Sequence, residues 1–169
     1  MGRVGWLPAG ALFLLVTACA PEAPPAVGST EVFRGAWFEI AYPASFEPRP
    51  SLESPSAQGY DSVFFDAPGG EVSFYVYAPQ WGGEATDIAL DPATEELVDS
   101  ASSTVGPLTT TYTTIVARDG AWTRSYVTTF DDRGPTQWTI GWRYASEQAR
   151  ERYEAAFTAF KESLQQFTD

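Results

Sequence analysis

The side chains that most often do chemistry in proteins are scarce in this sequence. It contains no histidine and a single cysteine, Cys19. Nucleophile systems that pair Ser or Cys with His are therefore excluded within the chain, as are zinc sites built on imidazole. One cysteine also excludes an internal disulfide and a cluster of four thiolates. Carboxylates remain as the obvious acid–base groups, and we expect no metal and no cofactor.

Three of the carboxylates, Asp61, Asp66 and Glu71, surround one predicted hairpin. Two of them held about 5–9.5 Å apart would suit glycoside hydrolysis, but proximity in sequence does not set that distance. Asp131-Asp132 precedes Arg-Gly-Pro, and we interpret the pair as turn chemistry because Asp accepts hydrogen bonds from its own backbone in turns. We expect a protein that is not an enzyme, with a carboxylate-based glycan-acting enzyme as the alternative.

Trp81 is the residue best placed for binding without catalysis. It lies in APQWGGEA, directly after a predicted strand and beside two glycines. An exposed Trp on such a loop would contact a sugar ring or a protein partner, whereas a Trp folded back over the sheet edge would be structural. Both interpretations stay open, and Trp81 is our candidate binding residue. Tyr75 and Tyr77, on the preceding strand, are expected in the core.

Cys19 stands between a short apolar run and a proline-rich stretch. Arg3 is the one charged residue before Glu22, and residues 9–18 read AGALFLLVTA, which is the layout of a secretory signal. Val16-Thr17-Ala18-Cys19 resembles the bacterial lipobox, and that resemblance implies cleavage before Cys19 and lipidation of its thiol. Two or more acyl chains hold a domain on a bilayer durably, whereas one is marginal. An uncleaved anchor and an incidental Cys are the alternatives.

These signals divide the chain into three parts. We expect a lipoprotein signal peptide over 1–18, the lipidated Cys and a flexible tether over 19–32, and a single globular domain over 33–169. The tether is rich in Pro, Ala, Gly and Ser, a composition typical of semi-extended linkers. Ala20, in place of Asp, resembles the sorting pattern for the outer membrane of diderm bacteria. We therefore expect a lipoprotein facing the periplasm, with the inner membrane or a monoderm cell membrane as alternatives.

The charge balance restricts the partners. The chain has 10 Lys and Arg against 22 Asp and Glu, a net charge of −12. Phosphate backbones are bound by clustered cations, so nucleic acid is not expected as a partner. Adhesion to anionic lipid by charge is equally unexpected, which leaves the acyl chains on Cys19 as the contact with the membrane.

The first half of the domain is patterned as strands. Phe38, Ile40 and Tyr42 alternate with Glu39 and Ala41, and Pro43 ends the run. Residues 45–61 contain three prolines and predict a long surface loop. Aromatic and β-branched runs on both sides of Pro68-Gly69-Gly70 predict a hairpin. Because both faces of 72–77 are apolar, we expect both sides of the sheet to be covered.

The second half predicts a helix, a meander and a closing helix. Asp91-Pro92 carries the residue types of a helix start, so we expect about three helical turns from there. Residues 109–144 predict three strands, with turns at Asp119-Gly120 and at 131–135. With Phe130 opposite Thr136, one face of the last two strands would hold Trp122, Arg124, Tyr126, Thr128, Phe130, Trp138, Ile140, Trp142 and Tyr144.

A C-terminal amphipathic helix is expected to cover that face. Ser146 is the expected cap, and the helix would run to about Phe167. Its apolar stripe at helical spacing comprises Ala149, Tyr153, Ala156, Phe157, Phe160 and Leu164. An antiparallel sheet flanked by helices is an α+β arrangement.

This order of segments resembles a known superfamily. WFEIAYPASF, VSFYVYAP and a final helix ending in FKESLQQF resemble the PsbP-like superfamily over about 33–167. The resemblance implies an α/β/α sandwich and a non-catalytic binding or assembly module. Metal sites of the photosynthetic members use His, so none is carried over. We expect a membrane-anchored lipoprotein of the cell envelope whose partner is an envelope protein or a glycan. A carboxylate-based glycan-acting enzyme and a glycan-binding module that uses Trp81 are the alternatives.

Overall fold

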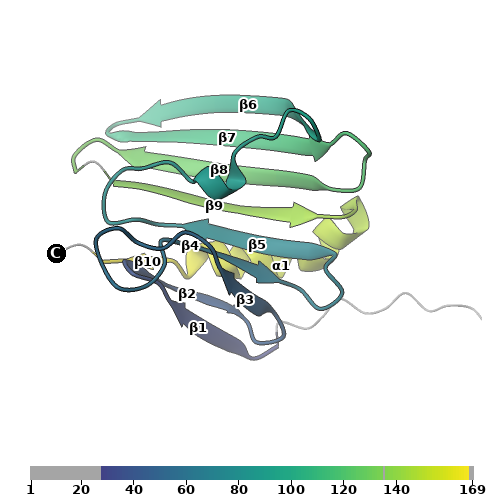
Figure 1. Ribbon diagram of the computed structural model, residues 1–169, viewed down its shortest axis with the longest axis horizontal. Coiled ribbons are helices and arrows are strands. Elements are labelled where there is room, and N and C mark those ends of the chain that lie inside the picture. The colour runs from purple at the N-terminus through teal and green to yellow at the C-terminus, as the bar shows by residue number, and fades with distance from the viewer. Residues whose placement is uncertain (1–27, 135, 168–169) are drawn as a thin grey trace, which may run out of the picture.

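The strands of this protein form two antiparallel sheets, shown in Figure 1 for a computed structural model that describes residues 28–134 and 136–167. The larger sheet has the strand order β3-β4-β5-β9-β8-β7-β6, and the smaller has the order β1-β2-β10. The strands are β1 (Thr30–Arg34), β2 (Phe38–Pro43), β3 (Glu47–Pro50), β4 (Ser62–Asp66), β5 (Val72–Tyr77), β6 (Glu95–Val105), β7 (Leu108–Ala117), β8 (Thr123–Asp131), β9 (Thr136–Tyr144) and β10 (Gln165–Gln166). The helical segments are η1 (Thr86–Ile88), a 3-10 turn, and α1 (Glu147–Glu162).

Helix α1 forms where the apolar stripe predicts it. The Ser146 hydroxyl caps the helix by accepting from the Ala149 backbone N–H at 3.1 Å. The helix packs on β2, β5 and β9 and lies behind the large sheet in Figure 1. Phe157 stacks on Trp142 with ring centroids 4.3 Å apart, and Phe160 is 1% exposed. This aromatic layer between helix and sheets is the main core.

The other face of the sheet is covered by a loop and not by a second helix. Tyr75, Tyr77 and Tyr126 form a smaller buried cluster there, against which Ile88 of η1 packs. All six residues of β5 are buried, so the prediction of cover on both faces is confirmed. The α/β/α arrangement is not seen, because α1 is the one α-helix in residues 28–134 and 136–167. The predicted α+β class with an antiparallel sheet is confirmed.

The helix predicted from Asp91 is wrong, because that segment makes one turn and then becomes strand β6. The Asp91 side chain accepts from the Ala93 N–H at 3.0 Å and the Thr94 hydroxyl at 2.8 Å, as a cap would. The chain then pairs with β7 from Glu95 to Val105, with a register shift after Leu97. A single turn is enough to satisfy the capping hydrogen bonds of Asp91. From Glu95 onward, pairing with the Thr-rich strand β7 determines the conformation.

The predicted pairing of the last two strands is wrong by one residue. Phe130 lies opposite Gln137, and Thr136 lies opposite Asp131. A shift of one residue moves every side chain of a strand to the other face. Trp142 therefore lies on the α1 side with Ser125, while Arg124 faces away from α1, and the predicted single aromatic face is divided between the two sides.

Other boundaries also differ from expectation. Strand β1 begins at Thr30, so the last residues assigned to the tether pair with β2. The predicted loop over 45–61 contains edge strand β3, where Pro48 and Pro50 are tolerated because an edge strand leaves half of its N–H groups unpaired. Helix α1 ends at Glu162, five residues before Phe167, because the chain returns to β2 as β10. The hairpin at Pro68-Gly69-Gly70 and the β7–β8–β9 meander are confirmed.

Candidate functional site

Trp81 lies beside a hollow at the end of β5 and is 53% exposed. The hollow has a volume of about 410 Å³, and its lining includes Leu52, Asp61, Tyr77 and Trp81. We call it the Trp81 pocket. Its size falls in the range of small-molecule sites, which measure about 300–1,000 Å³. The exposed ring places Trp81 among residues available for contact.

Asp61 brings an unsatisfied acceptor to the Trp81 pocket. Its backbone is fixed on both sides, since its N–H donates to the Leu52 carbonyl at 2.8 Å and its carbonyl accepts from the Ala78 N–H at 2.9 Å. The residue is 5% exposed, yet its Oδ1 atom has no hydrogen-bond partner among the described residues. Burial raises the pKa of Asp61, and the Ser54 hydroxyl opposes that rise. A buried carboxylate oxygen without a donor is a position that a donor on a ligand or water would satisfy.

Tyr77 and a glycine shape the inner wall of the Trp81 pocket. Burial, followed by the negative charges of Asp61, Asp87 and Glu84, raises the pKa of Tyr77, so its phenol stays neutral. A Cβ atom on Gly83 would lie 2.5 Å from the Tyr77 hydroxyl, so a larger residue here would have to displace that phenol. The Gly83 carbonyl accepts from the Gln137 side chain at 2.8 Å, which ties the loop to β9.

The charges around the Trp81 pocket have one sign. Its lining contains three carboxylates, Glu53, Asp61 and Glu84, and no Lys or Arg. Glu53 and Glu84 are exposed, whereas Asp61 is buried. The three acids therefore differ in solvation, and the pocket as a whole favours a group that donates hydrogen bonds or carries positive charge.

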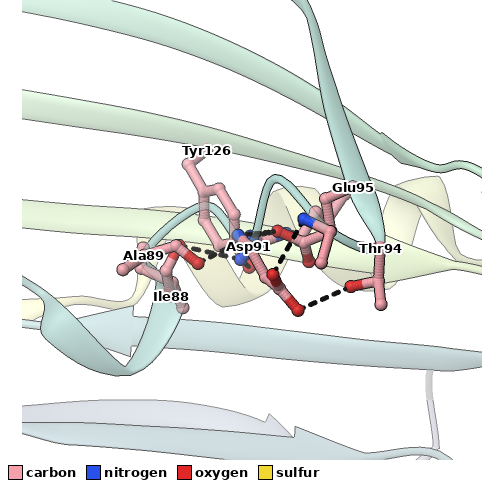
Figure 2. Close-up of polar contacts among 8 residues, drawn as sticks. Ile88, Ala89, Asp91, Thr94, Glu95 and Tyr126 are labelled. Atoms are coloured by element: carbon pink, nitrogen blue, oxygen red, sulfur yellow. Dashed lines mark hydrogen bonds and ion pairs between the residues drawn. The ribbon is translucent and has the colours of Figure 1, made fainter.

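Arg124 is the centre of a second polar cluster, on the sheet face opposite α1, and Figure 2 labels its partners Ile88, Ala89, Glu95 and Tyr126. Its guanidinium donates to the carbonyls of Ile88 at 2.9 Å and Ala89 at 3.1 Å. It also forms an ion pair with Glu95 at 2.5 Å. Glu95 accepts in addition from the Asp91 N–H at 2.8 Å. These contacts fasten the segment between β5 and β6 to the sheet.

A cavity of about 200 Å³ adjoins this cluster and is lined by three arginines, Arg49, Arg124 and Arg143. Arg49 donates to Asp66 at 2.9 Å, so two of the three cations already have carboxylate partners. Arg143 lies directly opposite Arg124 on β9 and is near Asp66. The cluster satisfies most of its own charges and is primarily structural.

A third, apolar hollow of about 290 Å³ lies between β2, α1 and residues Gly28 to Thr30. Its two phenols are already engaged. The Tyr42 hydroxyl donates to Glu31 at 2.8 Å and the Tyr153 hydroxyl to Glu71 at 3.1 Å. Burial, and then the bond to Glu31, raises the pKa of Tyr42 to about 12. Unlike the Trp81 pocket, this hollow presents no unsatisfied buried polar atom among the described residues.

The carboxylates around the β4–β5 hairpin lie in three separate places. Asp66 accepts from Arg49 and from the Ser73 hydroxyl, and these bonds outweigh burial and lower the pKa of Asp66. Glu71 pairs with Arg152 of α1 at 3.1 Å, on the other face of the sheet. Asp61 precedes Asp66 by five residues of extended chain, roughly 16 Å. The hypothesis that two of these three pair as a catalytic dyad therefore lacks the geometry.

The remaining sequence hypotheses have mixed outcomes. Asp131 accepts from the Arg133 backbone N–H at 3.1 Å and pairs with its guanidinium, which confirms turn chemistry. Cys19 lies outside the described residues. Within 28–134 and 136–167, no three Cys, Asp or Glu side chains gather closely enough to hold a metal. No described helix is long and apolar enough to span a bilayer.

The sequence analysis did not predict that Asp61 and Trp81 line the same pocket. The signal was present in the hairpin: pairing of Ser62 with Tyr77 brings Asp61 beside Ala78, three residues before Trp81. Asp61 was instead grouped with the acids that follow it. The buried pair of Arg124 and Glu95 was also missed, because Glu95 was assigned to a helix and its partner lies 29 residues away.

Comparison with known proteins identifies the architecture. No protein-family model matches the sequence, and no curated protein matches it significantly. The solution structure of cyanobacterial PsbP (CyanoP) from Synechocystis sp. PCC 6803 covers 90% of this chain and 99% of that chain, with a TM-score of 0.50 and 12% identity. The fold is PsbP-like.

A second solved structure, from Bacteroides thetaiotaomicron VPI-5482, is a weaker match. It shares 14% identity, covers 83% of this chain and 49% of that chain, and has a TM-score of 0.45. At these identities the PsbP-like likeness concerns the fold alone, because one fold hosts many unrelated sites.

Proposed function

We propose that this protein is a non-catalytic binding module of the bacterial cell envelope, held at the membrane by lipid on Cys19, with the Trp81 pocket as its binding site. The observation that carries the proposal is one pocket lined both by half-exposed Trp81 and by buried Asp61, whose Oδ1 atom has no hydrogen-bond partner among the described residues. An aromatic platform next to a fixed polar acceptor suits recognition of a polar ligand with an apolar face, such as an envelope glycan.

The anchoring part of the proposal rests on the lipobox-like segment that ends at Cys19. The proposed location of the anchored protein is the periplasmic face of the outer membrane. It is tested by expressing the full chain in a diderm bacterium and analysing the mature amino terminus by mass spectrometry. We expect a mass corresponding to acylated Cys19, and recovery of a Cys19→Ala form in the soluble fraction. An unmodified thiol on freely soluble protein would overturn the anchor.

The binding part is tested by capture of envelope fragments on the full chain. Trp81→Ala should reduce capture at least tenfold, because an aromatic anchor in a binding site contributes about 2 kcal/mol or more. Tyr112→Ala is the matched control, since Tyr112 on β7 is 51% exposed and lies away from the pocket. Equal capture by both variants would rule out the Trp81 pocket as the binding site.

A glycan-acting enzyme is the second candidate, favoured by one observation. The Trp81 pocket holds buried Asp61 together with exposed Glu53 and Glu84, and carboxylates in contrasting environments can divide the roles of acid and base. Hydrolysis of a captured glycan that Asp61→Asn abolishes while binding persists would replace the non-catalytic proposal with this one.

A further inference from the structure

We infer that the ligand of the Trp81 pocket carries a positively charged amine, paired with the carboxylate of Asp61 in the pocket lining, on a body the size of one sugar. This inference rests on the proposed function of the pocket and narrows it to a chemical class: a protonated amino sugar as opposed to a neutral one.

The first argument comes from the unsatisfied carboxylate. An ionised carboxylate accepts hydrogen bonds and cannot donate them, so the group that completes Asp61 must be a donor. Asp61 is 5% exposed and its main chain is bonded on both sides, to Leu52 and Ala78. The main chain of Asp61 is thus fixed at the wall of the pocket before a ligand arrives, which lowers the cost of ordering on binding.

The second argument comes from charge. The lining carries Glu53, Asp61 and Glu84 and no cation, in a chain whose net charge is −12. A neutral hydroxyl would supply a hydrogen bond to Asp61 but leave its charge uncompensated. An ammonium group supplies both the donor and the opposite charge, and charge-assisted hydrogen bonds are roughly twice as strong as neutral ones.

The third argument comes from the aromatic wall. Cations are attracted to the face of an aromatic ring, and Trp is the best of the aromatic residues for this. Trp81 is half-exposed while Tyr77 is buried, so the indole of Trp81 is accessible to a ligand. The pocket volume of about 410 Å³ accommodates a compact ligand of monosaccharide size.

The test is calorimetric titration of the full chain with three matched sugars: glucosamine, N-acetylglucosamine and glucose. We expect glucosamine to bind at least tenfold more tightly than either neutral sugar. Asp61→Asn should remove that preference, because the amide keeps the shape of the side chain but not its charge. Trp81→Ala should weaken glucosamine binding at least tenfold. Asp99→Asn, which removes an exposed acid on β6, is the control and should change nothing.

The outcomes separate this inference from the proposed function. If N-acetylglucosamine or glucose binds as tightly as glucosamine, or if Asp61→Asn keeps the preference, the amine inference is overturned while binding at the pocket stands. If no sugar binds but Trp81→Ala still reduces capture of envelope fragments, the inference is again overturned and the function survives. If no sugar binds and Trp81→Ala leaves capture unchanged, the proposed function fails as well. Circular dichroism of each variant establishes that it is folded.

Discussion

Replacement of Arg124 by alanine should destabilise this protein strongly. The side chains of Arg124 and Glu95 are 7% and 11% exposed, and their charged atoms lie 2.5 Å apart. Alanine at this position leaves the Glu95 carboxylate buried without its cation and deprives the carbonyls of Ile88 and Ala89 of their donor. Breaking a buried ion pair from one side costs about 3–5 kcal/mol. For a domain of this size that corresponds to a fall in Tm of roughly 6–20 °C.

The measurement is urea and thermal unfolding of the full chain followed by circular dichroism. The matched control is Glu96→Gln, one residue along β6. Glu96 pairs with Arg118 at 3.6 Å, and these two side chains are 59% and 51% exposed. Exposed pairs of this kind contribute about 0–1 kcal/mol, so the control should stay close to the parent protein. Glu95→Gln should be destabilised as much as Arg124→Ala, because it leaves the buried Arg124 cation without its carboxylate partner.

A combined Arg124→Met and Glu95→Leu variant separates two quantities. One is the free-energy cost of an unpaired buried charge, and the other is the net contribution of the ion pair to stability. Apolar replacement of both partners is often neutral or stabilising, so the double variant should recover most of the stability lost by either single one. If Arg124→Ala unfolds within about 1 kcal/mol of Glu96→Gln, the pair is solvated in solution and the reasoning from burial is refuted. Hydrogen exchange in residues 86–95 should accelerate in Arg124→Ala, because that segment loses its fastening to the sheet.

Three further predictions concern single positions. Phe160→Ala should lower the free energy of unfolding in urea by about 3–5 kcal/mol, because Phe160 is 1% exposed and its ring lies against Phe65 and Phe74; a loss below about 1 kcal/mol would mean that α1 does not pack as described. Gly141→Ala should destabilise by at least about 1 kcal/mol, since its Cβ would lie 2.5 Å from the Ser125 carbonyl oxygen, and an unchanged Tm would contradict that close approach. Burial raises the pKa of Asp61 above 3.8, so the native state binds this proton more tightly and stability falls as pH rises through the window above 3.8. Asp61→Asn should remove that fall in stability and be at least as stable as the parent protein at neutral pH. Urea unfolding at a series of pH values measures this. If the stability of the variant falls with pH in parallel with that of the parent, the carboxylate is not buried as described.

The elements that depend on local chemistry could be predicted from the sequence. The Ser146 cap and the stripe of Tyr153, Phe157 and Phe160 specify α1, and all of these residues lie close together in the sequence. Capping and helical periodicity both act between near neighbours. The hairpin at Pro68-Gly69-Gly70 is equally local. Trp81 was recognisable as a candidate because a glycine-rich loop follows a strand.

The elements that depend on distant partners could not be predicted in the same way. Asp91-Pro92 is chemically a helix start, but the residues after it pair with β7 and the buried Glu95 bonds to Arg124. The register of β8 and β9 differs from the expected one by a single residue, and the burial of Trp142 against Phe157 of α1 distinguishes the two pairings.

By itself the sequence determined the α+β composition, the acidic and histidine-free chemistry and the positions of most turns, since these depend on residue type and short-range spacing. Only the tertiary structure decided that Asp61, buried with an unpartnered oxygen, lines one pocket with Trp81, and that Asp66 and Glu71 are engaged elsewhere. The physical reason is that burial and the choice of partner arise from contacts between strands and loops far apart in the chain. Those contacts form only when the whole sheet assembles with its helix.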